Sequence, residues 1–412
     1  MTLTLFIGKE SSNKMPEENK ESKEKKKIHN LNRILLGARE LGASDVHLQI
    51  GYRPITRING RIKFLDTEEC NGEFLQEVID GTLDKDQNVR LMKNKSIDIA
   101  IEVMGKIKKD KENKRYRHRV NIAYLTKGNN TEPFIAFRLI PDKIRPIEKI
   151  GFPDDVWKNI VGWKGQEEAE NVPGLRRGLV LVTGITGSGK TTTLASLINQ
   201  INETRAEHII TMEDPIEYVY PRANSIIKQR EIGSSLNSFA DGVKYSLRED
   251  PDIILVGEIR DRDTALHALE ASETGHLVFS TLHDPSATET VDRYVGLFNP
   301  DEQDKVRISL ASNLAYVFSQ NLIPCEKGTE RRLVMEVMNV RDTPAIRTRI
   351  RRGEYNQLIG EMQSHRKYKN ITFDHRLVEL YKTGELGDMR KDEVLSYAHD
   401  PESVKQDIDK LK

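Results

Sequence analysis

A phosphate-binding loop constrains the fold of this chain more than any other feature of its sequence. Residues 184–191, Gly-Ile-Thr-Gly-Ser-Gly-Lys-Thr, match the pattern Gly-x-x-x-x-Gly-Lys-Thr, in which glycines let backbone N–H groups turn inward toward phosphate oxygens. The apolar run Leu179–Val182 comes before the loop, and Thr192–Ile198 follows it with helical spacing. A strand, a tight loop and a helix in this order favour a nucleotide site in an α/β domain over a chance glycine-rich turn.

Each part of the loop has a predicted role in holding a nucleotide. Lys190 supplies positive charge to the β- and γ-phosphates, Thr191 offers a hydroxyl to Mg²⁺, and the helix adds the dipole of its N-terminus. We therefore expect ATP and Mg²⁺ as cofactors. The candidate nucleotide-binding residues are Gly184, Thr186, Gly187, Ser188, Gly189, Lys190, Thr191 and Thr192.

Two acidic segments follow the loop and meet the other needs of phosphoryl transfer to water, namely a metal ion and an oriented water molecule. The strand predicted at His208–Met212 leads directly into the acidic stretch Glu213–Glu217, and a second apolar strand releases Glu258 just past a glycine, in the form of a Walker B segment. Ligands bind where strands of open α/β sheets end. The candidate catalytic carboxylates are Glu217 and Glu258, and the candidate metal-handling residues are Thr191, Glu213 and Glu258.

Two histidines bracket a further apolar strand, since His276 precedes it and His283 ends it. A single histidine is more often a structural hydrogen-bonding group than a catalyst. Two histidines around a central strand beside the acidic segments favour a functional role. We expect His276 and His283 to sense the γ-phosphate or to couple it to a neighbouring subunit.

Arginines on predicted strands form the last group of candidates. The segment Lys106–Arg119 carries eight basic and two acidic residues, and its lysines are expected at a solvated hairpin tip. Arg117 and Arg119 lie two residues apart on a strand, so they share one face. With Arg138, they could reach a phosphate across a domain or subunit boundary, because the guanidinium group is planar and always charged.

The chain divides into two folded domains with charged ends. We expect a disordered charged tail over residues 1–27, an α+β domain on an antiparallel sheet over 28–141, and a linker over 142–177. From residue 178 strands and helices alternate, as in a mainly parallel sheet with crossover helices. That second domain is predicted to end at residue 385, and a charged helical tail at 386–412 follows it.

Composition limits the classes of protein to which the chain can belong. Its 64 basic and 64 acidic residues give a formal net charge of zero, which disfavours direct binding of nucleic acid through bulk charge. Cys70 and Cys325 are the only cysteines, too few for a disulfide framework or a four-cysteine zinc site, and this fits a reducing cytosol. No apolar run is long enough to span a bilayer. We therefore expect a cytoplasmic protein that reaches the membrane only through partners.

Taken together and in this order, these segments resemble the secretion and pilus motor ATPases of the PilT type. Thr211–Tyr218 is similar to that family's Asp box, Asp250–Asp261 to its Walker B segment and Thr274–His283 to its His box. Ala43–Leu48 is similar to the opening of the family's PAS-like N-terminal domain. The segments around Arg119 and Arg138 are similar to its arginine-bearing strands. The resemblance covers roughly residues 30–385, and it implies a RecA-like P-loop ATPase domain preceded by a PAS-like α+β domain.

The resemblance also implies how the protein works. It implies a homo-hexameric ring that hydrolyses ATP to ADP and phosphate, with nucleotide between the two domains of each subunit and arginines lent across the cleft. Glu217 and Glu258 would share water activation and Mg²⁺ handling, and the sequence does not divide these roles between them. The ring would lie in the cytoplasm, peripheral at the inner membrane, and act on an inner-membrane platform protein of a pilus or secretion machine.

Three features bear on the subfamily. Assembly-type relatives usually carry a four-cysteine zinc site, which this chain lacks. Retraction motors carry Ala-Ile-Arg-Asn-Leu-Ile-Arg, whereas residues 345–351 here read Ala-Ile-Arg-Thr-Arg-Ile-Arg and differ at two central positions. Ser238–Lys244 resembles the corresponding stretch of the DotB/TraJ proteins of type IVB secretion and conjugation. We favour type IV pilus retraction, the basis of twitching motility, and keep type IVB secretion or conjugation as the alternative.

Other classes of nucleotide-binding protein make different demands on the sequence. A RecA-like nucleic-acid motor needs basic loops or aromatic platforms, and only 6% of the residues are aromatic. A P-loop kinase needs an acceptor pocket and an arginine-rich lid, where this chain has a histidine-bracketed strand. A regulator that binds nucleotide without hydrolysis would not need Lys190, Glu217 and Glu258 together.

Overall fold

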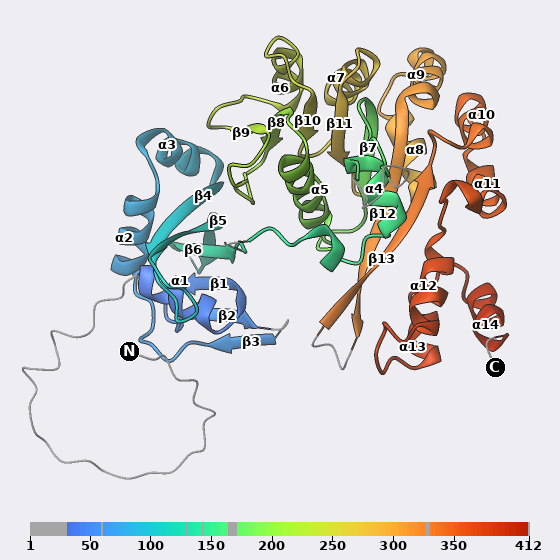
Figure 1. Cartoon of the computed structure of the whole chain (residues 1–412). Helices are drawn as coiled ribbons and strands as arrows, with labels where there is room; N and C mark the ends of the chain where they lie inside the picture. Colours follow the sequence, from blue (N-terminus) through green and yellow to red (C-terminus); the bar gives the residue numbers. More distant parts are fainter. Residues whose placement is uncertain are drawn as a thin grey trace, which may run out of the picture. The chain divides into compact units, whose positions relative to one another are not determined.

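The computed structural model describes residues 31–58, 61–128, 130–141, 143–163, 171–325 and 330–410. The chain divides into two compact units, Met1–Lys143 and Ile144–Lys412, and each unit has a β-sheet of its own (Figure 1). The tail expected over 1–27 and the turn expected at residues 59 and 60 lie outside the described residues.

The N-terminal unit is an α+β fold on an antiparallel sheet, as the sequence predicted. Its six strands lie in the order β3-β2-β1-β6-β5-β4. Its elements are α1 (Leu31–Glu40), β1 (Ala43–Gln49), β2 (Ile55–Ile58), β3 (Arg61–Phe64), α2 (Gly72–Thr82), α3 (Lys85–Asn94), β4 (Ser96–Gly105), β5 (Lys114–Lys127) and β6 (Asn130–Leu139). Sequence analysis missed α2 and α3, although Asn71 and Asp84 cap their N-termini with side-chain oxygens.

Alternation along the strands gives this sheet one buried face and one polar face. Val120 and Ile122 of β5 and Phe137 of β6 are buried with Leu35 of α1 and Leu75 of α2. Residues between them in sequence point to the opposite face. That face carries Arg117, Arg119 and Arg138, which are all partly or fully exposed.

The C-terminal unit is an α/β domain on a seven-stranded sheet of order β13-β12-β7-β11-β10-β8-β9. All neighbouring strands are parallel except β12 and β13. Its strands are β7 (Gly178–Thr183), β8 (His208–Glu213), β9 (Ile226–Glu231), β10 (Ile253–Val256), β11 (Leu277–Thr281), β12 (Leu314–Cys325) and β13 (Glu330–Asn339).

Helices cover both faces of this sheet. Its longer helices are α4 (Asp154–Val161), α5 (Lys190–Thr204), α6 (Phe239–Ser246), α7 (Arg262–Glu273), α8 (Ala287–Gly296), α9 (Pro300–Asn313), α10 (Pro344–Arg352), α11 (Leu358–Ser364), α12 (Phe373–Lys382) and α14 (Pro401–Asp409). Its shorter helices are the 3-10 helices η2 (Ile147–Lys149), η5 (Tyr355–Gln357) and η6 (Arg366–Tyr368) and the α-helix α13 (Lys391–Leu395). Helices α4 and α5 share one apolar core with the sheet, and α6 to α11 share the core on its other face.

Two segments predicted to lie outside the domains belong to the C-terminal unit. The expected linker contributes Ile147, Phe152 and Trp157 to the core around α5, and Trp157 is fully buried. The expected C-terminal tail folds as α13 and α14, whose Val394 and Val404 pack with α12. Both were predicted to lie outside the domains because their apolar residues stand singly among charges, so only the folded structure shows that they share a face.

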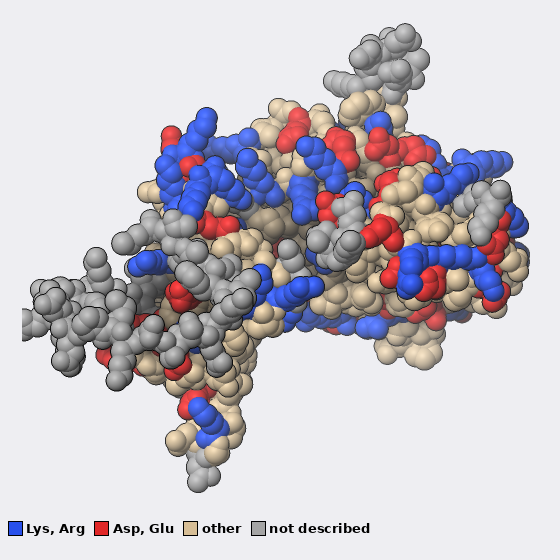
Figure 2. Space-filling view, turned by 90° about the horizontal axis from the view of Figure 1, so that it is seen from below, with Lys and Arg blue, Asp and Glu red and all other residues tan. Residues whose placement is uncertain are grey.

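The surface agrees with a chain of zero net charge. Figure 2 shows Lys and Arg side chains interspersed with Asp and Glu side chains on the face that it displays. Among the residues that the structure describes, no helix is both long and apolar enough to cross a bilayer.

Candidate functional site

The parallel strands of the C-terminal unit bring the predicted motifs to one edge of the sheet. Strands β7, β11, β10 and β8 lie side by side in that order and in register, so that Val256 of β10 lies between Ser280 of β11 and Met212 of β8. The chain leaves these strands into the phosphate loop, His283, Glu258 and Glu213 respectively. Parallel strands end at the same edge, so four segments far apart in sequence meet there.

The phosphate loop has the close backbone packing that its glycines permit. Gly184 has a φ of 137°, which side-chain-bearing residues rarely adopt. A Cβ at Gly184 would also overlap the backbone carbonyl of Gln320 on the neighbouring strand β12. The Gln320 side chain donates from Nε2 to the Ser188 carbonyl over 2.7 Å. Strand β12 therefore supports the loop from one side, and substitution of Gly184 is expected to disrupt it.

Lys190 begins helix α5 and turns its amine back over the loop. Its Nζ donates to the carbonyl of Gly184 over 2.7 Å and to that of Ile185 over 3.3 Å. Burial lowers the pKa of Lys190, while the nearby carboxylate of Glu258 opposes that shift. The amine is thus held in place where a phosphate group would replace the two carbonyl contacts.

A line of contacts joins the loop to the Walker B carboxylate. The Nζ of Lys190 lies 3.4 Å from Nδ1 of His283, and Nε2 of His283 lies 3.3 Å from Oε2 of Glu258. The other oxygen of Glu258 pairs with Arg260 at 2.7 Å, and the Glu258 side chain is only 13% exposed. The structure therefore brings Lys190, His283, Glu258 and Arg260 together, as sequence analysis predicted for the first three.

The acidic segment after β8 reaches the same helix by a different route. Glu213 is buried and accepts hydrogen bonds from Thr211 Oγ1 over 2.7 Å and Gln229 Nε2 over 3.1 Å. Burial raises the pKa of Glu213 in spite of these donors. The chain then passes the cis bond before Pro215, and the hydroxyl of Tyr218 lies 3.1 Å from Thr192 Oγ1 in the first turn of α5. Glu217 is the residue before Tyr218 in this segment.

The two candidate histidines lie at opposite edges of the sheet. His276 precedes β11, and its carbonyl accepts a hydrogen bond from the N–H of Gly178, the first residue of β7. Its ring contacts the Ala271 carbonyl and the Thr274 hydroxyl. The expectation that both histidines flank the site therefore needs correction, because a strand in a parallel sheet has its two ends on different edges. His283 stays a candidate, and His276 is a helix-to-strand connector.

The three candidate arginines share the polar face of the N-terminal unit's sheet. Arg119 and Arg138 are cross-strand neighbours on β5 and β6. Their partners within the unit are acidic, with Arg119 at 3.7 Å from Asp98 and Arg138 at 3.2 Å from Asp45. Arg117 pairs with Glu102 at 3.5 Å. The side chains of the Arg119–Asp98 pair are 35% and 45% exposed, and exposed pairs of this kind contribute little to stability.

The residues at the sheet edge fit a magnesium ion bound chiefly by phosphates and water. Mg²⁺ favours oxygen ligands and commonly takes one or two carboxylates or hydroxyls beside substrate phosphates. Thr191 is exposed, and Glu258 is linked through His283 to Lys190, the residue before Thr191. Glu213, in contrast, is buried among its own donors. Among the described residues no group of three or more His, Cys, Asp or Glu could hold a metal alone. Thr191 and Glu258 are thus better suited than Glu213 to direct metal contact.

Several residues at this edge were not predicted. Gln320, Tyr218 and Arg260 each contact a predicted site residue. Gln320 lies in the polar stretch Ser319–Asn321 of an otherwise apolar strand, and such a stretch is the signal that could have found it. Ser188 adds a buried Oγ with no hydrogen-bond partner among the described residues, which fits a loop prepared to bind phosphate.

The chain is similar over most of its length to proteins of a known family. The sequence model of the family described as "Type II/IV secretion system protein" matches residues 20–359. A type IV pilus retraction ATPase of Pseudomonas aeruginosa is 36% identical over 351 residues, which are 85% of this chain and 94% of that protein.

Solved structures agree with that match. The pilus retraction motor PilT with bound ADP superposes with a TM-score of 0.76 at 37% identity, over 92% of this chain and all of that one. The ATPase DotB of Legionella pneumophila gives a TM-score of 0.73 at 27% identity, over 93% of this chain and 99% of that one. These similarities confirm the resemblance drawn from the motifs and the two-domain fold that it implied.

Proposed function

The chain belongs to the type II/IV secretion system protein family, and on that premise we propose that it is a hexameric motor ATPase that hydrolyses ATP to ADP and phosphate to power type IV pilus retraction. The observation that carries the proposal is the line of contacts from Lys190 through His283 to Glu258. It joins the group that binds phosphate to the group that activates water at one sheet edge.

The site residues divide the work of phosphoryl transfer to water. Backbone N–H groups from Gly184 to Thr191 and the amine of Lys190 bind the β- and γ-phosphates. When bound, Mg²⁺ supplies charge that stabilises the leaving phosphate oxygens. Glu258, with Glu217 as the second candidate, orients the attacking water and accepts its proton. His283 lies between Lys190 and Glu258, so its ring is placed to respond when the γ-phosphate arrives or leaves.

Arginines complete the charge around the transferred phosphoryl group. Arg117, Arg119 and Arg138 lie on one face of the sheet, and each pairs with a carboxylate of the same unit. We propose that they supply positive charge to nucleotide bound by the C-terminal unit of the same or a neighbouring subunit. Closing and opening of these sites around a homo-hexamer in the cytoplasm then moves an inner-membrane platform protein.

The departure from the retraction-type segment at Arg349 has a local structural account. Its Nε donates to Oε1 of Glu361 over 2.9 Å, and one of its terminal nitrogens donates to Oε2 of Glu354 over 2.5 Å. Arg349 thus joins α10 to Glu354, just before η5, and to Glu361 in α11. Retraction is favoured over the type IVB secretion alternative by sequence similarity, since the pilus retraction ATPase of Pseudomonas aeruginosa is 36% identical to this chain and DotB is 27% identical.

The direction of force is tested in the source cell. A strain lacking this chain is complemented with the wild type or with Lys190→Ala, and its surface fibres and protein export are measured. Retraction predicts surplus, unretracted fibres that only the wild type removes. Missing fibres would indicate assembly, and normal fibres with lost export would indicate secretion; either outcome would contradict the proposal.

A further inference from the structure

The segment that carries Glu258 is attached to the rest of the C-terminal unit at its two ends. At its start, Gly257 donates to the carbonyl of Met212 over 2.8 Å and accepts from Thr281 Oγ1 over 2.7 Å. Ile259 is buried and donates to the Thr281 carbonyl over 3.0 Å. These contacts hold the residues on both sides of Glu258 against β8 and β11, and the chain then enters helix α7.

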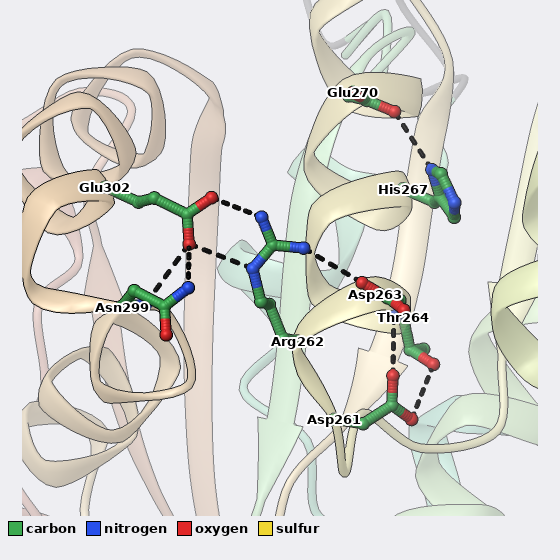
Figure 3. Close-up of polar contacts among 8 residues, drawn as sticks. All are labelled: Asp261, Arg262, Asp263, Thr264, His267, Glu270, Asn299 and Glu302. Atoms are coloured by element: carbon green, nitrogen blue, oxygen red, sulfur yellow. Dashed lines mark hydrogen bonds and ion pairs between the residues drawn. The ribbon is translucent and has the colours of Figure 1, made fainter.

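The end of this segment at the start of α7 is fixed by Arg262 and Glu302, whose two-pronged ion pair we call the fork. Asp261 caps the helix by accepting from Thr264 N over 2.8 Å and from Thr264 Oγ1 over 2.9 Å. Arg262 then reaches away from α7 and donates to both oxygens of Glu302 in the first turn of α9, from Nε over 2.9 Å and from a terminal nitrogen (Figure 3). Its remaining nitrogen donates to Asp263 over 2.9 Å. The bidentate geometry sets direction as well as distance.

Glu302 is itself held rigidly. Its Oε2 accepts from both the backbone N–H of Asn299 over 3.2 Å and the Asn299 side chain over 3.1 Å, which forms a capping box at α9. The guanidinium of Arg262 also lies 5.9 Å from the ring of buried Phe298. Chiefly because of the hydrogen bonds from Arg262, the pKa of Glu302 is lowered to about 2. Both Arg262 and Glu302 are therefore charged at any physiological pH.

Two side-chain contacts therefore join residues 258–262 to residues 283–302. Glu258 contacts His283 at 3.3 Å. Four residues later in the chain, Arg262 pairs with Glu302, and helix α8 lies between His283 and Glu302 in sequence. The Arg262–Glu302 pair adds a contact between α7 and α9 to the hydrogen bonds that hold Gly257 and Ile259 against β8 and β11. We propose that Arg262, through Glu302, is a positioning residue that sets the orientation of Glu258 toward His283 and the phosphate loop. This inference rests on the proposed role of Glu258 in hydrolysis.

A positioning role and a purely structural role predict different measurements. The Arg262 and Glu302 side chains are 36% and 30% exposed, and exposed ion pairs contribute little to folding. Removal of the fork should therefore leave the assembled protein folded. Misplacement of a catalytic group by a fraction of an ångström, in contrast, lowers kcat without a matching change in KM.

The experiment is a double-mutant cycle on the full chain. Arg262→Gln, Glu302→Gln and the double variant are compared with the wild type for kcat, KM for ATP, melting temperature and assembly state. Each single variant is expected to lower kcat about tenfold with KM changed less than about twofold, and the double variant is expected to lose no more than either single one. Lys391→Gln, which breaks the 2.6 Å exposed pair with Asp409, is the matched control and should leave kcat unchanged.

Each possible result either supports the inference or overturns it. Unchanged kcat in both single variants would contradict it, as would losses that add in the double variant or that follow a fall in melting temperature or assembly. If Arg262→Gln does not assemble, Glu302→Gln, which preserves side-chain shape, decides alone. Glu258→Gln is assayed in parallel, since normal hydrolysis by that variant would reject the proposed function, whereas its loss beside unaltered fork variants would reject only the positioning role.

Discussion

The amine of Lys190 and the imidazole of His283 meet at 3.4 Å, so the first residue of helix α5 contacts the segment that follows strand β11. Ninety-three residues separate the two in sequence. Parallel pairing of β7 with β11 brings them together, since the phosphate loop that leads to Lys190 follows β7 and the segment of His283 follows β11 at the same edge. His283 contacts Glu258 through its other nitrogen, Nε2, at 3.3 Å, which is the basis of its proposed role.

This contact predicts that the two histidines of the motif differ in effect. His283→Ala removes the group between Lys190 and Glu258, and we expect kcat for ATP hydrolysis to fall by about 10-fold or more. His276→Ala changes a residue at the opposite edge of the sheet, and its kcat should stay within about twofold of the wild type. Steady-state phosphate release measures both. Equal losses in the two variants would contradict the assignment.

Replacement of Glu258 tests the division of roles between the two acids. Glu258→Gln keeps the size of the side chain but removes the base, so ATP should bind and stay unhydrolysed, with turnover lowered by about 10²–10⁴-fold. Rapid filtration with labelled ATP measures the trapped nucleotide. Glu217→Gln is the paired variant. Normal turnover in Glu258→Gln with lost turnover in Glu217→Gln would move water activation to Glu217.

Mixed assemblies test whether arginines act between subunits. Arg119→Ala and Lys190→Ala rings are each expected to hydrolyse ATP poorly, because one lacks a charge on the phosphate and the other lacks the loop amine. If Arg119 serves a neighbour's site, mixing dissociated subunits of the two variants should restore part of the activity at sites that combine an intact loop with an intact arginine. An absence of restoration in reassembled mixed rings would place Arg119 on the nucleotide of its own subunit. Arg138→Ala is tested in the same way.

The N-terminal unit should lose stability in mild acid because of His118. This side chain is fully buried, and neither ring nitrogen has a hydrogen-bond partner among the described residues. Burial, reinforced by the charge of Arg39, lowers the pKa of His118 from 6.5 to about 3. The unfolded chain then binds a proton that the folded unit excludes, so stability is complete above pH 6.5 and falls as the pH drops toward 3.

Chemical denaturation of the wild type at pH 7.5 and 5.0 should show a loss of about 2 kcal/mol from this residue. His118→Gln cannot take up the proton and should reduce that loss, whereas His267→Gln on the surface of α7 should not. Equal acid sensitivity of wild type and His118→Gln would show that other groups cause it.

How far the sequence predicts this molecule differs between its parts. The edge that holds Lys190, Glu258 and His283 was predictable because each residue lies in the segment that follows an apolar strand, and parallel strands end together. His276 shows the limit of that reasoning, since nearness in sequence does not tell which end of a strand a residue occupies. Gln320 shows another limit, because its neighbour in the sheet, β7, lies more than 130 positions away in the chain.

The boundaries were harder to predict than the motifs. Trp157 and Val404 belong to the C-terminal unit's cores, yet both lie in segments whose composition is that of a linker or a tail. Burial of such isolated apolar residues depends on partners distant in sequence, which no local pattern reveals. Arg349 is the converse case, since its departure from the family segment gains a reason only from the two glutamates that it contacts.

The amine of Lys190 is the group on which the whole account depends, so ATP hydrolysis by Lys190→Ala is its most direct test. The wild type and Lys190→Ala are assayed for phosphate release at saturating ATP and Mg²⁺, with Lys382→Ala, which alters an exposed lysine on α12, as the control. We predict that Lys190→Ala loses at least about 10²-fold in kcat while it keeps its fold and assembly, and that Lys382→Ala matches the wild type. Wild-type turnover by a folded Lys190→Ala would contradict the account.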